Sequence, residues 1–221
     1  MNFIFMLTVG DRTIPDCLAV ADAIRPLGLR HVGFKDVGVP FATLEALHER
    51  LRSSGVTTYL EVVSTSTGTA VASAKAAAKL GVNKLLGGAD AAPILAAAGN
   101  VACYPFCGRP EGHPTKLGGS PASVAEDCRR LEAMGARGVD LLAYRATEAD
   151  PIDLVSAARK ALKGELIVAG SINSPDRIRA VRDAGADAFT IGTTAIAGTF
   201  EPNRKGLAAQ LEAILDTVAR A

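Results

Sequence analysis

Two segments near the end of the chain decide the fold: Leu166-Ile-Val-Ala-Gly-Ser-Ile-Asn173 and Ala188-Phe-Thr-Ile-Gly-Thr-Thr-Ala195. Each is a short apolar run that ends in glycine and hydroxyl residues, and the pattern between them predicts an amphipathic helix over Ser174–Ala184. Parallel strands that end side by side in this way gather backbone N–H groups and hydroxyls at one spot, where the start of a following helix adds its positive dipole end. The pattern predicts a phosphate site, whose residues are Gly170, Ser171, Gly192, Thr193 and Thr194. The alternative is that both glycines serve only tight turns.

The same alternation of apolar run and amphipathic helix extends over the whole chain. Strands are expected at Phe3–Val9, His31–Lys35, Thr57–Val63, Lys84–Leu86, Val101–Phe106, Gly138–Ala143, Leu166–Ala169 and Ala188–Ile191. A final helix is expected over Lys205–Ala219. Strict alternation without a linker predicts one domain over residues 1–221, and eight such units close naturally into a (β/α)8 TIM barrel. An open doubly wound sheet is the rival, but Val9-Gly10-Asp11-Arg12 is not a dinucleotide-binding loop.

Local signals mark where the helices begin and end. Ser120-Pro121, Asp150-Pro151 and Ser174-Pro175 place proline just inside a first turn, after a residue that caps helices well. Gly81 and Gly185 each follow a helical pattern and precede the next strand. Glycine at this point predicts a left-handed cap that turns the helix back onto the sheet.

Composition limits the possible functions. Apolar residues make up 48% of the 221 residues and aromatics 5%, as an interior of parallel strands built from Ala, Val, Leu and Ile requires. A net charge of +1 without a basic stripe argues against nucleic acid. No apolar run approaches the roughly 18 residues that suggest a membrane span, and Met1–Thr8 lacks the charged start of a secretory signal. We therefore expect a cytoplasmic protein, and the sequence leaves open whether it forms a homo-oligomer.

The cysteines indicate neither disulfides nor a metal site. Cys17, Cys103, Cys107 and Cys128 are too scattered for a disulfide framework, and only His113 lies near the Cys103–Cys107 pair. Buried core positions account for these thiols better than zinc does. The sequence thus predicts no metal and no cofactor.

The segment Ile167–Ala195 resembles the end of the ribulose-phosphate-binding barrels. This superfamily includes the histidine- and tryptophan-pathway isomerases, hexulose-phosphate synthase and N-acetylmannosamine-6-phosphate epimerase, and the segment is most similar to the epimerase. The resemblance implies a barrel that binds a phosphorylated small molecule. It does not identify the particular family, because the strand-3 pattern Asp-x-Lys-x-x-Asp of the synthase type is missing.

Polar residues at the carboxyl ends of barrel strands are candidates for catalysis. Strand 1 is expected to end at Asp11, strand 2 at Lys35-Asp36 and strand 3 at Glu61. Lys35 follows an apolar strand, so desolvation is expected to lower its pKa and make it a base or an imine-forming nucleophile. Glu61 would orient Lys35 or carry a proton, with Asp11 or Asp36 in support. The alternative is a structural bridge between Lys35 and Asp36 or Glu61.

Further candidates are expected to contact the substrate. Tyr144 and Arg145 end strand 6. The loop 107–119 is longer than usual and carries His113, so it is a candidate lid over an anionic substrate, or else a disordered surface loop. Lys84 begins its strand and is expected to be solvated at the opposite end of the barrel.

These features favour an enzyme that acts on a small phosphorylated carbonyl or sugar compound, either an aldol-type lyase or an isomerase or epimerase. A non-catalytic regulatory barrel that binds a phosphorylated metabolite is the alternative. A metal-dependent hydrolase is disfavoured, because no His-x-His follows strand 1. The substrate itself is not set by the sequence.

Overall fold

The computed structural model describes residues 1–62, 64 and 66–220. The barrel strands are β1 (Asn2–Met6), β4 (His31–Lys35), β5 (Thr57–Val62), β6 (Lys84–Gly87), β7 (Ala102–Tyr104), β10 (Gly138–Leu141), β11 (Glu165–Val168) and β12 (Ala188–Ile191). The helices are α1 (Cys17–Ile24), α2 (Phe41–Ser53), α3 (Thr67–Leu80), α4 (Ala91–Ala97), α5 (Pro121–Ala133), α6 (Pro151–Ala161), α7 (Pro175–Asp183), α8 (Thr193–Ile196) and α9 (Leu207–Ala219). Short 3-10 turns are η1 (Arg25–Leu27) and η2 (Ala143–Arg145). All the predicted strands are present with small shifts at their ends. Val63, the predicted end of the third, lies outside the described residues.

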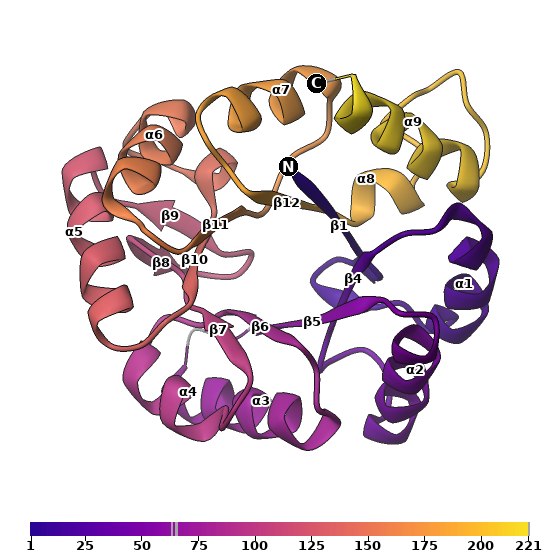
Figure 1. Ribbon diagram of the computed structural model, residues 1–221, viewed down its shortest axis with the longest axis horizontal. Helices are drawn as coiled ribbons and strands as arrows, with labels where there is room; N and C mark the ends of the chain where they lie inside the picture. The colour runs from indigo at the N-terminus through magenta and orange to yellow at the C-terminus, as the bar shows by residue number, and fades with distance from the viewer. Residues whose placement is uncertain (63, 65, 221) are drawn as a thin grey trace.

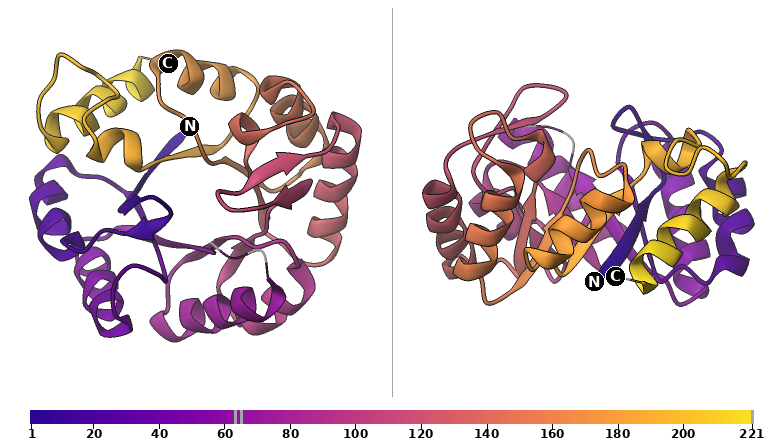
Figure 2. Two further views of the ribbon diagram at one scale, coloured as in Figure 1. Left: turned by 180° about the vertical axis from the view of Figure 1, so that it is seen from behind. Right: turned by 90° about the horizontal axis from the view of Figure 1, so that it is seen from above.

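The strands form one parallel eight-stranded sheet in the order β10-β11-β12-β1-β4-β5-β6-β7. A bridge between Phe106 and Asp140, and a hydrogen bond from the Asp140 N–H to the Pro105 carbonyl, join β7 to β10. Viewed along its axis, the sheet is a nearly closed ring with the helices outside it (Figure 1). In the side view, both chain termini lie at the lower end, so the carboxyl ends of the strands face upward (Figure 2, right). The predicted barrel is confirmed.

Alternation along β4 shows how the sheet divides its side chains. Val32 and Phe34 belong to the large apolar core between the sheet and the helices. A Cβ on Gly33 would meet Met6 Sδ at 2.3 Å, which places Gly33 on the inner face, and Lys35 shares that face. A smaller cluster fills the lower barrel axis: Ile4, Met6, Tyr59, Leu86, Tyr104, Ile167 and Ala188. Lys35 and Glu61 are partners in register and lie above it.

The predicted helix signals are confirmed. The side chains of Ser120, Asp150 and Ser174 accept hydrogen bonds from N–H groups of the first turns of α5, α6 and α7. Gly81 and Gly185 have φ of 76° and 98°, in the left-handed region expected after a helix.

Two short hairpins at the strand ends were not predicted. One pairs β2 (Thr8–Val9) with β3 (Arg12–Thr13), and the other pairs β8 (Arg109–Glu111) with β9 (Lys116–Gly118). Gly10 and Asp11, with φ of 56° and 59°, form the two-residue turn of the first hairpin. Strand β1 therefore ends at Met6, and the prediction that Asp11 ends this strand is wrong: Asp11 lies at a hairpin tip.

Candidate active site

The carboxyl ends of the strands surround a cavity of about 340 Å³. The residues that line it come from six of the predicted strand ends and from the first hairpin: Met6, Thr8, Asp11, Lys35, Glu61, Arg145, Gly170, Ser171, Ile172, Asn173, Thr190, Ile191, Gly192, Thr193 and Thr194. Most of the predicted site residues therefore lie around one cavity. This is the end of the barrel where function is expected.

Lys35 lies between two carboxylates at the floor of this cavity. Its Nζ donates a hydrogen bond to Asp11 Oδ1 at 2.6 Å and lies 3.5 Å from Glu61 Oε2. The three side chains are 5%, 16% and 12% exposed, respectively. Thr13 fixes the hairpin to β4, because its Oγ1 accepts from the Lys35 N–H at 2.8 Å and donates to the Lys35 carbonyl at 2.7 Å. The hairpin thus holds Asp11 against Lys35.

The charge state of Lys35 differs from the sequence-based expectation. Burial by itself lowers the pKa of Lys35, as predicted, but the nearby carboxylates of Glu61 and Asp11 outweigh burial and raise its pKa. The expectation of a lowered pKa is wrong, because it considered burial alone and left out the effect of the carboxylates beside the ammonium. Lys35 is therefore a proton donor in this state and not a free amine.

Asp11 is held as a carboxylate. Burial opposes its ionisation, but the Lys35 ammonium, with smaller effects from Arg145 and His113, lowers the pKa of Asp11 overall. Arg145 lies 3.9 Å from the same carboxylate. Among the described non-glycine residues, only Asp11 and Ser171 have positive φ, at 59° and 58°, and both line the cavity. Strain of this kind is typical of functional sites.

The predicted phosphate residues also line this cavity. Gly170 has φ of 77°, and a Cβ there would lie 2.6 Å from Arg145 Nε, so glycine makes room for the guanidinium beside this loop. A Cβ on Gly192 would lie 2.8 Å from the Met6 carbonyl oxygen. Thr193 and Thr194 begin α8, where no preceding helical carbonyl accepts from their N–H groups. Two loops and one guanidinium thus present donors to the same space.

Three of the predicted site residues do not line this cavity. Asp36 accepts a hydrogen bond from Ser73 Oγ at 2.5 Å. Asp36 and His113 line a neighbouring cavity of about 290 Å³. The Tyr144 ring is half-buried beneath the Arg177 guanidinium, 4.4 Å from it, and burial raises the pKa of Tyr144. Their roles in catalysis or substrate binding stay predictions.

Asp140 is a buried acid inside the barrel that the sequence analysis did not single out. It lies on β10, fully buried, within electrostatic reach of Glu61, Lys35 and Arg145. The sequence carried a signal for this placement. Side chains alternate between the two faces of a strand, so Asp140, two residues after Gly138 in an apolar strand, faces the barrel interior. Thr190 of β12 is a second inward-facing polar residue that was not singled out, and it lines the cavity.

The loop 107–119 is a structured hairpin, which contradicts the disordered-loop alternative. Leu117 is buried, and its carbonyl accepts from the Thr147 N–H at 2.9 Å. Arg109 pairs with Glu148, which also accepts from the Gly119 N–H at 2.8 Å. The hairpin is thereby fixed to the residues that follow η2, and its role as a lid stays a prediction.

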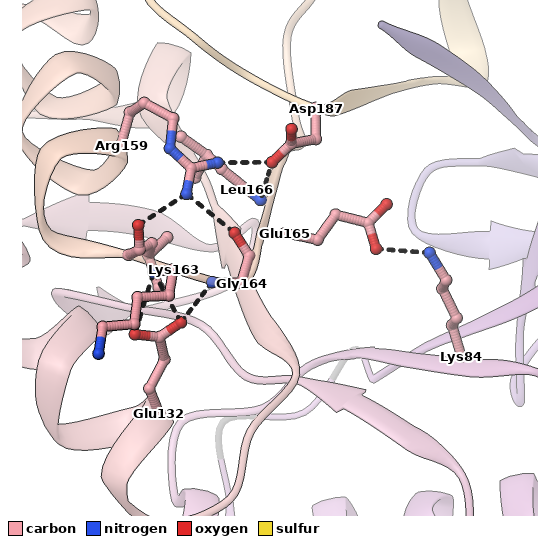
Figure 3. Close-up of polar contacts among 9 residues, drawn as sticks. Lys84, Glu132, Arg159, Lys163, Gly164, Glu165, Leu166 and Asp187 are labelled. Carbon is pink, nitrogen blue, oxygen red and sulfur yellow. Dashed lines mark hydrogen bonds and ion pairs between the residues drawn. The ribbon is translucent and has the colours of Figure 1, made fainter.

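Lys84 lies at the amino end of the barrel, as predicted, but it is not freely solvated. Its Nζ donates to Glu165 Oε2 at 2.5 Å (Figure 3) and lies 5.3 Å and 5.1 Å from the ring centres of Tyr59 and Tyr104. In the same region, the Arg159 guanidinium reaches Asp187 and the carbonyl of Gly164 (Figure 3). These contacts connect strands and loops at the end opposite the cavity, so they are structural.

Residues 1–62, 64 and 66–220 contain no group of three or more His, Cys, Asp or Glu side chains arranged to hold a metal ion. Over the same residues, no helix combines the length and apolarity needed to cross a bilayer.

Comparisons with known proteins support the barrel and the resemblance. The family model "Histidine biosynthesis protein" matches residues 109–201, a stretch that contains both predicted phosphate loops. No curated protein sequence matches the chain. The segment Ile167–Ala195, which carried the predicted resemblance, lies within this match, and the particular family is not determined.

Solved structures show the same fold at low sequence identity. A KDPGal aldolase structure has a TM-score of 0.67 and 14% identity, with 99% of this chain and 97% of that chain covered. Orotidine 5'-phosphate decarboxylase from Pyrococcus horikoshii OT3 has a TM-score of 0.67 and 13% identity, with 98% and 99% covered. N-acetylmannosamine-6-phosphate 2-epimerase from Clostridium perfringens has a TM-score of 0.62 and 13% identity, with 98% and 93% covered. These neighbours are enzymes with TIM-barrel folds.

Proposed function

We propose that the chain is an enzyme that acts on a small phosphorylated carbonyl or sugar compound. The loops after β11 and β12 would bind the phosphate through Gly170, Ser171, Gly192, Thr193 and Thr194. Lys35 would act at the other end of the substrate. The observation that carries this proposal is that Lys35, flanked by Asp11 and Glu61, lines the same cavity as these loops. Phosphate binding would then supply the energy that orients the reacting carbon.

The charge state of Lys35 favours proton transfer over imine formation. With its pKa raised, the ammonium can donate a hydrogen bond to a substrate carbonyl and stabilise negative charge as it develops on that oxygen. Glu61 would take the proton from the carbon next to the carbonyl, which leaves an enediolate, and would return it to the former carbonyl carbon, while the hydroxyl proton passes to the former carbonyl oxygen. This outcome is isomerisation. If water instead protonates the first carbon of the enediolate from the opposite face, and Glu61 gives its proton to solvent, the outcome is epimerisation. Asp11 would keep Lys35 protonated and in place.

An aldol-type lyase with an imine at Lys35 is the second candidate among enzymes. An imine needs the free amine, and the two carboxylates beside Lys35 oppose loss of its proton. A non-catalytic regulatory barrel is the other candidate. Phosphate binding alone needs no buried Asp11–Lys35–Glu61 cluster, which favours the enzyme. We also propose a cytoplasmic location, because Cys17, Cys103, Cys107 and Cys128 are buried free thiols.

A thermal-shift screen of phosphorylated aldoses and ketoses tests the proposal. A ligand present at about 100 times its dissociation constant stabilises the folded state by about 2.7 kcal/mol. Hits are then incubated with the protein in deuterated water. Deuterium that enters the substrate carbon supports the enzyme, whereas stabilisation without exchange or turnover supports the regulatory barrel. A screen without any hit contradicts the phosphate site.

A further inference from the structure

Asp140 is a buried acid whose state the mechanism above does not explain. It pairs in register with Ile167 of β11, whose side chain belongs to the inner apolar cluster, so Asp140 faces the barrel axis. Its side chain is fully buried, and neither Oδ1 nor Oδ2 has a hydrogen-bond partner among the described residues. An ionised carboxylate is strongly disfavoured in such a position.

The groups that face Asp140 come from four segments. Glu61 of β5 is the strongest negative influence on Asp140, while Lys35 of β4 and Arg145 of η2 are positive. The Cys107 thiol, in the segment after β7, also feels its charge. Burial and Glu61 together outweigh Lys35 and Arg145, and they raise the pKa of Asp140 well above its usual value.

A proton on Asp140 balances the charges around the cavity. Asp11 and Glu61 are the carboxylates that flank Lys35, and Arg145 lies beside Asp11. Two negative and two positive charges then balance, provided that Asp140 is neutral. An ionised Asp140 would compete for Lys35, repel Glu61 and oppose the entry of an anion.

We propose that Asp140 is a positioning residue that carries a proton in the folded protein. As a neutral acid beneath the cavity, it leaves Lys35 to pair with Asp11 and Glu61, and it keeps the cavity receptive to an anionic substrate. This inference rests on the proposed function, because it assigns Asp140 to the same site.

Unfolding measured against pH tests the proton directly and needs no substrate. Asp140 has a pKa of about 3.9 when unfolded. The pKa of Asp140 is higher in the folded state. Its contribution to the free energy of unfolding is therefore complete below pH about 4 and is lost as the pH rises through the folded pKa. Within that window unfolding releases a proton. The unfolding equilibrium constant of the wild type should therefore rise about tenfold per pH unit relative to that of Asp140→Asn. A ratio that stays constant from pH about 5 to 8 would overturn the proposal.

Asp176→Asn is the matched control. The Asp176 side chain is 90% exposed on α7. The ratio of the wild-type unfolding equilibrium constant to that of Asp176→Asn should therefore stay constant over the same range of pH. If Asp140→Asn does not fold, the carboxyl ¹³C resonance of Asp140 is followed in the wild-type protein. A protonated side chain at neutral pH supports the proposal, and an ionised one overturns it.

Sulfate binding tests the positioning role, because sulfate remains a dianion over this whole range of pH. We expect the wild type to lose affinity for sulfate toward alkaline pH, as Asp140 ionises, and Asp140→Asn to retain it. Parallel profiles for the two proteins would overturn the positioning role. If sulfate binds neither protein while the unfolding ratio still rises about tenfold per pH unit, the proposed phosphate site is wrong and the proton on Asp140 stands.

Discussion

Replacement of Lys35 by methionine tests both the stability and the chemistry of the buried charge cluster. The Lys35 ammonium lies 2.6 Å from Asp11 and 3.5 Å from Glu61. Removing one partner of a buried ion pair destabilises by about 3–5 kcal/mol. We expect a loss of about 3 kcal/mol, the lower value, because Arg145 remains beside Asp11 and offsets part of its charge. Loss of the hydrogen-bond donor to the substrate carbonyl should also lower turnover by at least about 10²-fold, equivalent to about 2.7 kcal/mol in the barrier.

Lys84→Met is the matched control for this variant. The Lys84–Glu165 pair is also close, at 2.5 Å, with side chains that are 19% and 21% exposed, but it lies at the opposite end of the barrel. Urea unfolding should show a loss of stability for both variants, while turnover of a substrate found by the screen should fall only for Lys35→Met. Full turnover in folded Lys35→Met, or an equal loss of turnover in Lys84→Met, would refute the role of Lys35.

Two further predictions concern the phosphate loops and the pH dependence of stability. Gly192→Ala places a Cβ 2.8 Å from the Met6 carbonyl oxygen and 3.0 Å from that of Thr8, so β1 and β12 must separate and shift the loop donors. Calorimetry should show sulfate affinity at least about tenfold lower, the loss of roughly one hydrogen bond. Gly68→Ala, where a Cβ meets nothing within 4 Å, should leave affinity unchanged, and equal affinities in the two variants would contradict the site. Asp11 has a lowered folded pKa, so its contribution to stability is present above its unfolded pKa of about 3.9 and is lost as pH falls through the folded value. The stability difference between wild type and Asp11→Asn, measured by urea unfolding, should therefore disappear in acid. A difference that persists to pH about 2 would be evidence against the ion pair.

The fold was largely predictable because it depends on periodic features. In β4, Val32 and Phe34 alternate with Gly33 and Lys35, and this period alone separates the helix-facing side from the barrel interior. Helix starts such as Ser174-Pro175 are also predictable from local sequence, because proline already has the backbone angle that the first turn of a helix needs. Parallel strands then bring their carboxyl ends together, so the cavity and most of its lining residues followed from the strand assignments.

The electrostatics of the site could not be predicted in the same way. The pKa of Lys35 depends on Asp11, 24 residues earlier, and on a hairpin turn that needs positive φ at both Gly10 and Asp11. The spacing of apolar residues along the chain does not indicate such a turn. Asp140 was not predicted for a different reason: it lies within β10 and not at the carboxyl end of a strand, although the alternation of this strand already indicated the inner face.

The most direct test of the central claim is to treat the protein with its identified phosphorylated substrate and borohydride, in parallel with incubation in deuterated water. Lys35, held as an ammonium between Asp11 and Glu61, is expected to form no imine. Mass spectrometry should therefore find no reduced adduct at Lys35, while the substrate carbon next to the carbonyl gains deuterium. A borohydride-dependent adduct on Lys35, without exchange of that carbon, would contradict the account.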